Sequence, residues 1–363
     1  MDIPFDPQDV SRLLLDWYGR EGRDLPWRQT RDPYRIWLSE ILLQQTTVAA
    51  VVPHYLRLLE RFPDVNALAA AEVEAVIEEW AGLGYYRRAR NLHAAARIIV
   101  EQCNGTFPDT LEGLQALPGV GRSTAGAILS IAFDKPAPIL DGNVRRVLCR
   151  LFALRQPARC SAAEKKLWSW AGALTPEEQA HDYAQAIMDL GATVCIPSRP
   201  RCQECPLSRL CQGFCLGLQE EIPVSGTKKP VPTVGQVAVA ISCSGKVLLL
   251  RRPLEGMLGG LWEFPTSEML PEEKPETAAS RLLTDMVVQG TPVAAGRVRH
   301  AYSHFKLDLY LFRTEVSRPA VVSEGENEWV PVEDLADRAL HGAHKKALAH
   351  FDVSINIPNT ESV

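Results

Sequence analysis

Apolar residues recur at helical spacing through roughly the first 225 positions, and no strand-like alternation of any length appears before residue 230. Apolar side chains three or four positions apart lie on one face of a helix and can pack against a core. The first part of the chain is therefore expected to be all-α. Its pattern predicts helices over residues 8–20, 34–47, 48–61, 72–80, 85–102, 122–133, 144–154, 161–173 and 178–194.

Past residue 230 the pattern changes to the alternation that is typical of strands. It predicts one hairpin from 236–243 and 246–252 around Ser244-Gly245, and a second strand pair from 298–302 and 307–314. Helices near 277–287 and 343–350 complete a predicted α+β domain. We therefore expect a multi-domain chain, with an all-α domain over 1–215, a linker rich in proline, glycine and lysine over 216–233, and an α+β domain over 234–363.

Length and charge restrict the functional class. A chain of 363 residues suits two domains, each able to bury a core. The net charge of −5 means that a nucleic-acid partner would need positive charge concentrated on one face. No apolar run is long enough to span a bilayer, and the start of the chain is acidic, so we expect no membrane association, no export signal and a cytoplasmic location of bacterial type. Disulfides among the nine cysteines are then not expected.

Four cysteines within 17 residues form the spacing Cys195-x6-Cys202-x2-Cys205-x5-Cys211. Prolines at 197, 200 and 206 prevent a helix there, which indicates a compact loop wrapped around a metal. Zinc and an iron–sulfur cubane both accept four thiolates, and the spacing alone leaves both open. Cys215 is expected to lie outside the set.

A glycine turn precedes the 122–133 helix. Gly119 and Gly121 flank Val120, and a glycine turn that feeds a helix N-terminus presents backbone N–H groups that suit a phosphate. The turn lacks the Gly-Lys-Ser/Thr ending of nucleotide-binding loops, so the alternative is a plain link between two helices. Asp141 follows as the acidic N-cap of another helix and should stay ionised there.

Glu40 interrupts an almost wholly apolar helical turn. An unpaired carboxyl in such surroundings tends to keep its proton, which would make Glu40 a general acid. The alternative is an exposed helix glutamate. A protonated Glu40 and an ionised Asp141 would together give two carboxyl groups whose pKa values are pushed apart, as catalysis by an acid and an anion requires.

Positive charge is concentrated in residues 82–90, GLGYYRRAR. Apolar or aromatic side chains on such a glycine-flexible turn can wedge between base steps while arginines hold phosphates. The candidate DNA contacts are Leu83, Tyr85 and Arg88. The alternative is a solvated arginine face.

Taken together, these residues resemble the adenine DNA glycosylases of the helix-hairpin-helix, iron–sulfur superfamily, over nearly the whole chain. The matching motifs are SEILLQQTTV (39–48), GLGYYRRARNLH (82–93), LPGVGRSTAGAI (117–128), LDGNVRRV (140–147) and the four-cysteine loop. The resemblance implies a [4Fe–4S] cluster on the cysteines, a hairpin at Gly119 and Gly121 that grips DNA, and excision of adenine opposite 8-oxoguanine or guanine in base excision repair.

It also implies roles for single residues. Glu40 would protonate N7 of the flipped adenine and then activate water, Asp141 would stabilise the oxocarbenium-like sugar, and Asn143 would hold the water and the sugar side of the site. The adenine pocket would include Trp27, Arg28 and Gln185, and Gln45 and Tyr85 would lie beside the oxidised guanine.

One position separates this family from relatives that also cut the strand. Those enzymes carry a lysine two residues after the second hairpin glycine, whose amine forms a Schiff base with the sugar. Ser123 occupies this position here, so we expect glycosylase chemistry without an efficient lyase step. A bifunctional glycosylase for oxidised pyrimidines would need that lysine.

The carboxy-terminal domain resembles the Nudix fold, and GGLWEFP (259–265) matches the entry to its signature. The glutamate-rich helix that should follow is replaced by AASRLLTD (278–285), in which Asp285 is the single carboxylate. Magnesium coordination needs several carboxylates, so we expect a domain that binds and does not hydrolyse, rather than an active nucleotide diphosphatase. Ser303 and His304, after Tyr302, match the loop that contacts 8-oxoguanine. A non-catalytic mismatch sensor is a further alternative, and the presence of Glu40 and Asp141 argues against it.

Overall fold

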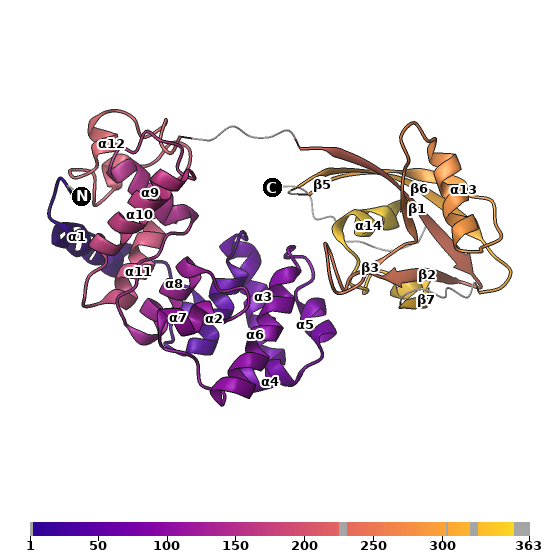
Figure 1. The fold of residues 1–363 in the computed structure, drawn as a ribbon, viewed down its shortest axis with the longest axis horizontal. Helices are drawn as coiled ribbons and strands as arrows, with labels where there is room; N and C mark the ends of the chain where they lie inside the picture. Colours follow the sequence, from indigo (N-terminus) through magenta and orange to yellow (C-terminus); the bar gives the residue numbers. More distant parts are fainter. Residues whose placement is uncertain (1–2, 225–230, 303, 320–325, 352–363) are drawn as a thin grey trace. The chain divides into compact units, whose positions relative to one another are not determined.

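The structure is a computed structural model that describes residues 3–224, 231–302, 304–319 and 326–351. Its contacts divide the chain into two compact units, residues 1–72 with 88–228, and residues 73–87 with 229–363. Ser303 and residues 225–230 of the predicted linker lie outside the described residues. Each unit is treated separately below (Figure 1).

The described residues of the first unit form helices and connecting loops and no strands, as predicted. Its helices are α1 (Pro7–Glu21), α2 (Pro33–Leu42), α3 (Val48–Arg61), α4 (Val65–Ala70), α6 (Arg87–Cys103), α7 (Leu111–Gln115), α8 (Arg122–Phe133), α9 (Gly142–Leu151), α10 (Ser161–Leu174), α11 (Ala180–Asp189) and α12 (Gln212–Cys215). Short turns of helix cover Pro26–Arg28, Leu190–Val194 and Cys202–Glu204, and α5 (Val73–Glu79) is grouped with the second unit.

Acidic and hydroxyl side chains fix where several helices begin. Asp32 accepts a hydrogen bond from the backbone N–H of Tyr34, and Asp64 and Thr110 cap α4 and α7 in the same manner. The predicted 34–47 helix is too long, because α2 ends at Leu42. Gln45 has a backbone φ of 59°, a left-handed conformation that no α-helix can continue through.

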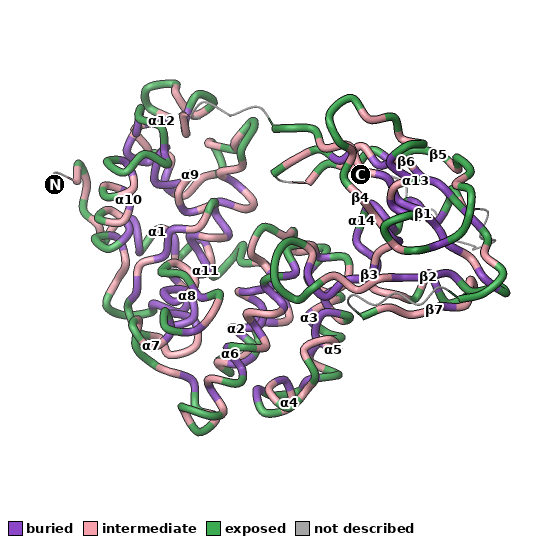
Figure 2. Tube along the Cα trace, turned by 45° about the vertical axis from the view of Figure 1, so that its right-hand side comes forward, coloured by how far each residue is buried: buried purple, intermediate pink, exposed green. Residues whose placement is uncertain are grey.

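The core of the helical unit forms where α8, α9 and α11 pack together beneath α1, and α2 lies against α8. Figure 2 colours many residues of these helices as buried. Gly126 on α8 allows the chain to pass closely, because a Cβ atom there would collide with the backbone carbonyl oxygen of Pro138. This close approach brings the segment that leads to Asp141 against α8.

The second unit is built on one sheet of seven strands among the described residues. They are β1 (Thr233–Cys243), β2 (Lys246–Arg251), β3 (Trp262–Glu263), β4 (Thr266–Glu268), β5 (Val293–Ala301), β6 (Lys306–Glu315) and β7 (Asn327–Pro331). Their order is β3-β2-β1-β6-β5, with β4 paired to β1 and β7 paired to β2. Both predicted antiparallel pairs, β1–β2 and β5–β6, are present, and β1 runs parallel to β6.

Alternate residues of the strands build two cores, one on each face of the sheet. On β1, Val237, Val239 and Ile241 face the core that α13 (Pro275–Asp285) covers. Ala238 and Ala240 face the opposite core, beneath α14 (Gly342–Ala347). Figure 1 shows the two helices on opposite sides of the strands. In the described part of the chain no helix is long and apolar enough to cross a bilayer.

The close approach at Gly126 gives a test of the helical core. Gly126→Ala is expected to lower the free energy of unfolding by about 1–3 kcal/mol, because the new methyl group meets backbone that cannot move aside. Gly172→Ala on α10 is the matched control, since nothing lies within 4 Å of its added Cβ. That change should raise the stability by up to about 1 kcal/mol. Urea unfolding of both variants measures the difference, and equal effects would contradict the packing at Gly126.

Candidate active site and nucleic-acid interface

A cavity of about 460 Å³ opens in the helical unit among α2, α8, α9 and α11. Its lining brings together residues that are far apart in the sequence. All seven residues proposed above for catalysis and for the adenine pocket lie on it: Trp27, Arg28, Glu40, Ser123, Asp141, Asn143 and Gln185. Gln44 also lines the cavity, and sequence reasoning had selected its neighbour Gln45 instead.

Glu40 projects from α2 between the buried side chains of Ser39 and Ile41. The pKa of Glu40 is raised to about 7, first by burial and second by the negative charge of Asp141, while the positive charge of Arg28 opposes the rise. A carboxyl group of this kind holds its proton near neutral pH and can donate it. The apolar surroundings that the sequence indicated are the first cause of the shift.

Asp141 is the N-cap of α9, and its Oδ1 accepts a hydrogen bond from the backbone N–H of Val144 at 2.7 Å. Burial raises the pKa of Asp141 as well, against the backbone N–H groups of Val144 and Asn143 and the charges of Arg146 and Arg145. The expectation that a helix terminus alone would set this pKa was therefore incomplete. Because the charge of Asp141 raises the pKa of Glu40, Asp141 ionises first and Glu40 keeps the proton.

A buried aspartate that sequence reasoning missed holds the arginines beside the cavity. Both oxygens of Asp189, whose side chain is fully buried, accept hydrogen bonds from the Arg28 guanidinium. Arg23 donates to Asp189 Oδ1 from its Nε at 2.8 Å. Burial opposes ionisation of Asp189, but these hydrogen bonds outweigh it and the pKa is lowered. The signal was present in the sequence, since Asp189, like Glu40, interrupts an apolar helical stretch.

Gln185 is oriented by a histidine one helical turn away. His181 Nδ1 lies 2.6 Å from the carbonyl oxygen of Ile131, and because a carbonyl only accepts, Nδ1 carries the proton. In the neutral ring, Nε2 of His181 is then an acceptor, and it takes a hydrogen bond from the Gln185 amide nitrogen at 2.9 Å. The amide nitrogen is committed to this contact, which leaves the amide oxygen of Gln185 to accept from a ligand in the cavity.

Ser123 and Asn143 both have partners that fix their orientation. The hydroxyl of Ser123 accepts a hydrogen bond from the backbone N–H of Leu140 at 2.9 Å, so it holds the residue directly before Asp141. The amide oxygen of Asn143 accepts from Arg146 at 2.9 Å. Ser123, at the position where strand-cutting relatives carry a lysine, thus helps to hold the segment that contains Leu140 and Asp141.

The hairpin before α8 leaves its backbone open. Gly119 has a φ of +81°, and a Cβ atom there would press on Asn91. At Gly121, the N-cap of α8, nothing lies within 4 Å of an added Cβ, and no side chain caps the helix. Packing within the protein therefore does not require a glycine at position 121. A ligand that approaches the backbone closely would require one, because any side chain would stand in its way. Gln45 and Tyr85 are both exposed, each at a backbone position with positive φ.

Two of the proposed DNA contacts are wrong as surface contacts. Arg88 is buried, and its guanidinium donates to the carbonyl oxygens of Ile41 and Leu42 at 3.1 and 3.0 Å and to that of Gln44. It satisfies the carbonyls that the end of α2 leaves without helical partners. Leu83 is also buried, with 8% of its surface exposed, whereas the neighbouring Tyr85 is 41% exposed.

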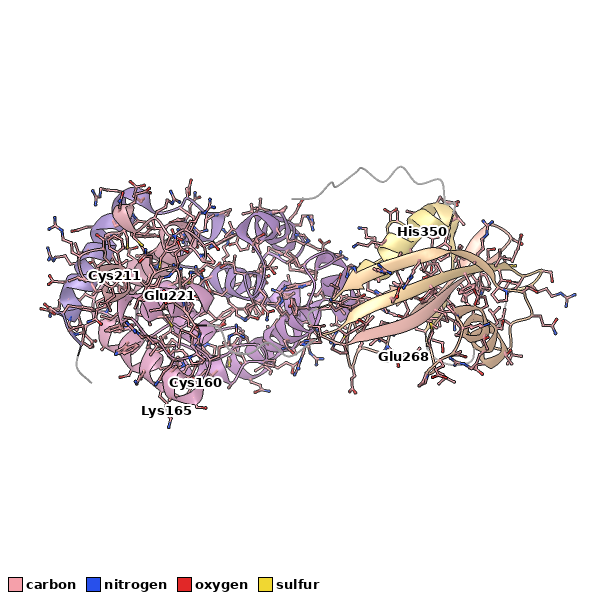
Figure 3. The ribbon with its side chains drawn as sticks, turned by 90° about the horizontal axis from the view of Figure 1, so that it is seen from above. Cys160, Lys165, Cys211, Glu221, Glu268 and His350 are labelled. Atoms are coloured by element: carbon pink, nitrogen blue, oxygen red, sulfur yellow. The ribbon has the colours of Figure 1, made fainter. Side chains whose placement is uncertain are left out.

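The four cysteines of the spaced set line one small cavity against α9. Arg150 on α9 donates to the sulfur of Cys195 at 3.3 Å and to the carbonyl oxygen of Ile196 at 2.7 Å. Burial raises the pKa of Cys205 to about 12 and that of Cys211 to about 11. Cys211 is labelled among the helices of this unit in Figure 3, and Cys215, four residues further along the chain, is exposed.

The described residues between β5 and β6 are Tyr302, His304 and Phe305. The backbone N–H of Tyr302 donates to the carbonyl oxygen of Phe305 at 2.9 Å, directly beyond the paired residues Ala301 and Lys306. His304 is exposed, and Ser303 lies outside the described residues. We call Tyr302, His304 and Phe305 the lesion loop, after the contact with 8-oxoguanine that the resemblance implies.

Comparison with known proteins places both units. Residues 38–172 match the model of the HhH-GPD superfamily of base excision DNA repair proteins, and residues 236–350 match that of the NUDIX domain. The adenine DNA glycosylase of Mus musculus is 35% identical over 96% of this chain and 79% of its own length. That of Buchnera aphidicola from Acyrthosiphon pisum is 41% identical over 61% of this chain and 64% of its own length. The chain belongs to the adenine DNA glycosylase family.

Solved structures agree for the helical unit. A thermostable thymine-DNA glycosylase superposes with a TM-score of 0.53 at 30% identity, covering 58% of this chain and 97% of its own. A non-covalent endonuclease III–DNA complex gives a TM-score of 0.50 at 25% identity, covering 59% of this chain and 99% of its own. The predicted fold class, the family and the assignment as a DNA glycosylase of base excision repair are thereby confirmed.

The coupling of the two carboxyl groups gives a direct test. Carbon-13 NMR of glutamate-labelled enzyme should show Glu40 titrating near pH 7, with its signal identified by its loss in Glu40→Gln. Asp141→Asn should move that midpoint to lower pH, because it removes the negative charge that favours the protonated form. A midpoint at the ordinary glutamate pKa of about 4.3 would contradict the site.

Proposed function

We propose that this glycosylase excises adenine paired with 8-oxoguanine or guanine in duplex DNA and leaves the DNA strand intact. The observation that carries the proposal is the pair of carboxyl groups in one cavity, one protonated near neutral pH and one ionised. Loss of a purine needs both an acid for the leaving base and an anion for the sugar.

The cavity suits an adenine taken out of the stack. Flipping a base costs a few kcal/mol and is easiest at a mispair. The side chain of Trp27 forms one wall, where it packs edge-on against Tyr55 at 5.3 Å between ring centroids. The exocyclic amine of adenine is a donor, and the oriented amide oxygen of Gln185 supplies the matching acceptor.

The chemistry follows from the protonation states. Glu40 gives its proton to N7, the bond from N9 to the sugar breaks, and its electron pair leaves with adenine. The positive charge on the sugar faces the Asp141 carboxylate, held at the start of α9. The ionised Glu40 then accepts a proton from the water that adds to the sugar carbon, with Asn143 oriented by Arg146 on the sugar side of the cavity.

Strand cleavage is not expected. A β-lyase step needs an amine that forms a Schiff base with the opened sugar, and a serine hydroxyl forms no imine. The hydroxyl of Ser123 is moreover engaged with the backbone of Leu140. We therefore assign Ser123 to the support of the Asp141 loop.

DNA would contact the open backbone of the hairpin. The first N–H groups of α8 after Gly121 carry no side-chain cap, and they suit a phosphate oxygen. The exposed Gln45 and Tyr85 would lie beside the oxidised guanine, which stays in the duplex. Positive charge here has to be local, because the chain as a whole carries −5.

The second unit would recognise the lesion and would not hydrolyse nucleotides. On α13, Arg281 pairs with Glu273 at 3.0 Å, and the helix contributes nothing to any cluster of three metal-ligand side chains among the described residues. His304 is exposed between β5 and β6, and together with Ser303, which lies outside the described residues, it would offer donors and acceptors to the altered edge of 8-oxoguanine.

The four cysteines fit a [4Fe–4S] cluster better than a single zinc ion. Tetrahedral Zn–S bonds of about 2.3 Å would place the sulfurs about 3.8 Å apart. In the described part of the chain, however, no three of these sulfurs lie within 4.8 Å of one another. A cubane of four irons spreads its thiolates further, and hydrogen bonds such as that from Arg150 to Cys195 stabilise them. When bound, the cluster would supply cross-links that fix the loop against α9.

The activity is tested with a duplex that carries adenine opposite 8-oxoguanine, half of each sample being treated with hot alkali. Breaks are expected only after alkali, because excision leaves an abasic site and no strand cut. Glu40→Gln and Asp141→Asn should each lower the single-turnover rate by at least about a thousandfold while the duplex still binds. Breaks without alkali would show a lyase, and activity in either variant would remove its assigned role.

The cluster is tested on purified protein. We expect visible absorbance together with about four iron and four sulfide per chain. Cys205→Ser should lose the absorbance and the folded helical unit, since Cys205 lines the cavity. Cys215→Ser is the matched control and should keep both, because Cys215 lies outside the cavity lining. One zinc per chain without iron would overturn the assignment.

A further inference from the structure

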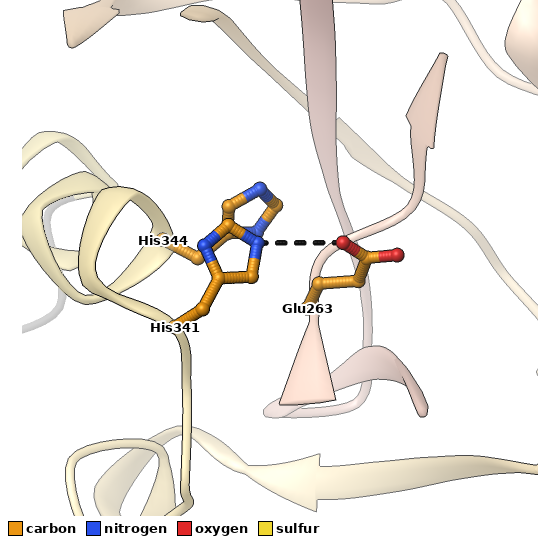
Figure 4. A group of neighbouring side chains, drawn as sticks. All are labelled: Glu263, His341 and His344. Atoms are coloured by element: carbon orange, nitrogen blue, oxygen red, sulfur yellow. Dashed lines mark ion pairs between the residues drawn. The ribbon is translucent and has the colours of Figure 1, made fainter. Parts of the chain in front are cut away.

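A chain of polar side chains runs behind the lesion loop. The hydroxyl of Tyr302 lies 3.0 Å from Nδ1 of His341, and Nε2 of His341 lies 3.4 Å from a carboxylate oxygen of Glu263, as Figure 4 shows. Arg252 donates to the same carboxylate oxygen at 2.7 Å. Glu263 comes from β3 and His341 directly precedes α14, so the chain joins two elements to the first residue of the lesion loop.

The directions of these contacts follow from what each group can donate. A carboxylate only accepts, so the proton of a neutral His341 is on Nε2, facing Glu263. The Nδ1 atom is then an acceptor for the hydroxyl of Tyr302. Burial raises the pKa of Tyr302 to about 12, so the phenol keeps its proton and donates it to His341 at all physiological pH values.

The same region gathers Glu263, His341 and His344 with ligand atoms within 4.8 Å of one another, the geometry of a small metal site. The protons of His344 argue against a metal. Its Nδ1 accepts a hydrogen bond from the backbone N–H of Phe264 at 2.9 Å, so the neutral ring carries its proton on the buried Nε2. A metal bound to Nε2 would take the place of that proton. The proton would then have to move to Nδ1, where it would break the hydrogen bond from Phe264.

Packing alone does not require the hydroxyl of Tyr302. Its ring lies 5.0 Å from that of Phe305 and 4.6 Å from that of His300, contacts that a phenylalanine would also make. The hydroxyl oxygen adds a hydrogen bond from the first residue of the loop to His341, which we call the tie. His341 is almost fully buried, with 3% of its surface exposed. The tie starts one residue before Ser303 and two residues before the exposed His304.

We propose that His341, held by Glu263, is a positioning residue that fixes the phenol of Tyr302 and thereby keeps the lesion loop in the conformation that distinguishes 8-oxoguanine from guanine. The inference rests on the proposed function, in which this loop reads the lesion. A loop already held in its binding conformation loses less entropy when it meets its ligand. Binding is therefore strengthened for adenine opposite 8-oxoguanine, the base pair that the loop contacts closely, and the enzyme prefers this pair to adenine opposite guanine.

Three single variants separate the tie from general packing. Tyr302→Phe removes only the hydroxyl. His341→Asn places an amide oxygen near the position of Nδ1 and keeps an acceptor for Tyr302, whereas His341→Gln places an amide nitrogen near Nε2 and keeps only the contact with Glu263. Thermal unfolding of each variant verifies that the fold is retained.

The measurement is the ratio of single-turnover excision rates for adenine opposite 8-oxoguanine and opposite guanine. Tyr302→Phe and His341→Gln are each expected to lower this ratio by roughly fivefold, the effect of one buried neutral hydrogen bond. His341→Asn should stay within about twofold of the wild-type ratio. The Tyr302→Phe, His341→Gln double variant should fall no further than either single variant, because both remove the same bond.

Other outcomes overturn the inference. A wild-type preference that survives Tyr302→Phe, or losses that add in the double variant, would show that the tie does not set the loop. A ratio that changes when the wild-type enzyme is treated with EDTA or with Zn²⁺ would assign the cluster to a metal instead. A wild-type enzyme with no preference for 8-oxoguanine would overturn the proposed lesion reading itself, and the inference with it.

Discussion

The negative charge of Asp141 next to an uncharged Glu40 is the interaction on which the rest of the structure depends. Burial alone raises the pKa of both carboxyl groups and does not decide which of them ionises first. The backbone N–H groups at the start of α9 make that decision, because they stabilise charge on the capping residue only. The first turn of α9 must therefore be held accurately, and Ser123 does this from α8 through the backbone of Leu140.

The cysteine loop supports the same helix from its other side. Arg146 donates to the carbonyl oxygen of Cys195 at 2.7 Å and also to the amide oxygen of Asn143 in the cavity. One turn further along, Arg150 binds the sulfur of Cys195 and the carbonyl oxygens of Ile196 and Pro197. Two arginines thus connect the cysteine loop to α9, and Arg146 also reaches Asn143 in the cavity. Outer contacts of this kind set the orientation of the groups that do the chemistry.

Local sequence patterns predicted a large part of this arrangement. The helices at 48–61 and 122–133 match α3 and α8 residue for residue, because amphipathic spacing and a glycine turn are local features. Glu40 was found because it breaks an apolar pattern. Arg88 was misplaced, since a run of arginines does not show which one turns inward to bind the end of α2. The parallel pairing of β1 with β6 depends on residues about seventy positions apart and leaves no local pattern.

In each of the two proposed recognition sites, a ring nitrogen of a histidine faces a group that can only accept a hydrogen bond. The carbonyl of Ile131 fixes the proton of His181 on Nδ1, and the carboxylate of Glu263 fixes that of His341 on Nε2. Each ring then offers its remaining lone pair to one neighbour and so transmits an orientation, to the amide of Gln185 and to the phenol of Tyr302. A second proton on either ring would turn that acceptor into a donor and reverse the orientation. Under the proposed function, selectivity for the excised base and for its partner would therefore depend on the same property, the ring nitrogen of a histidine that its neighbours leave as the acceptor.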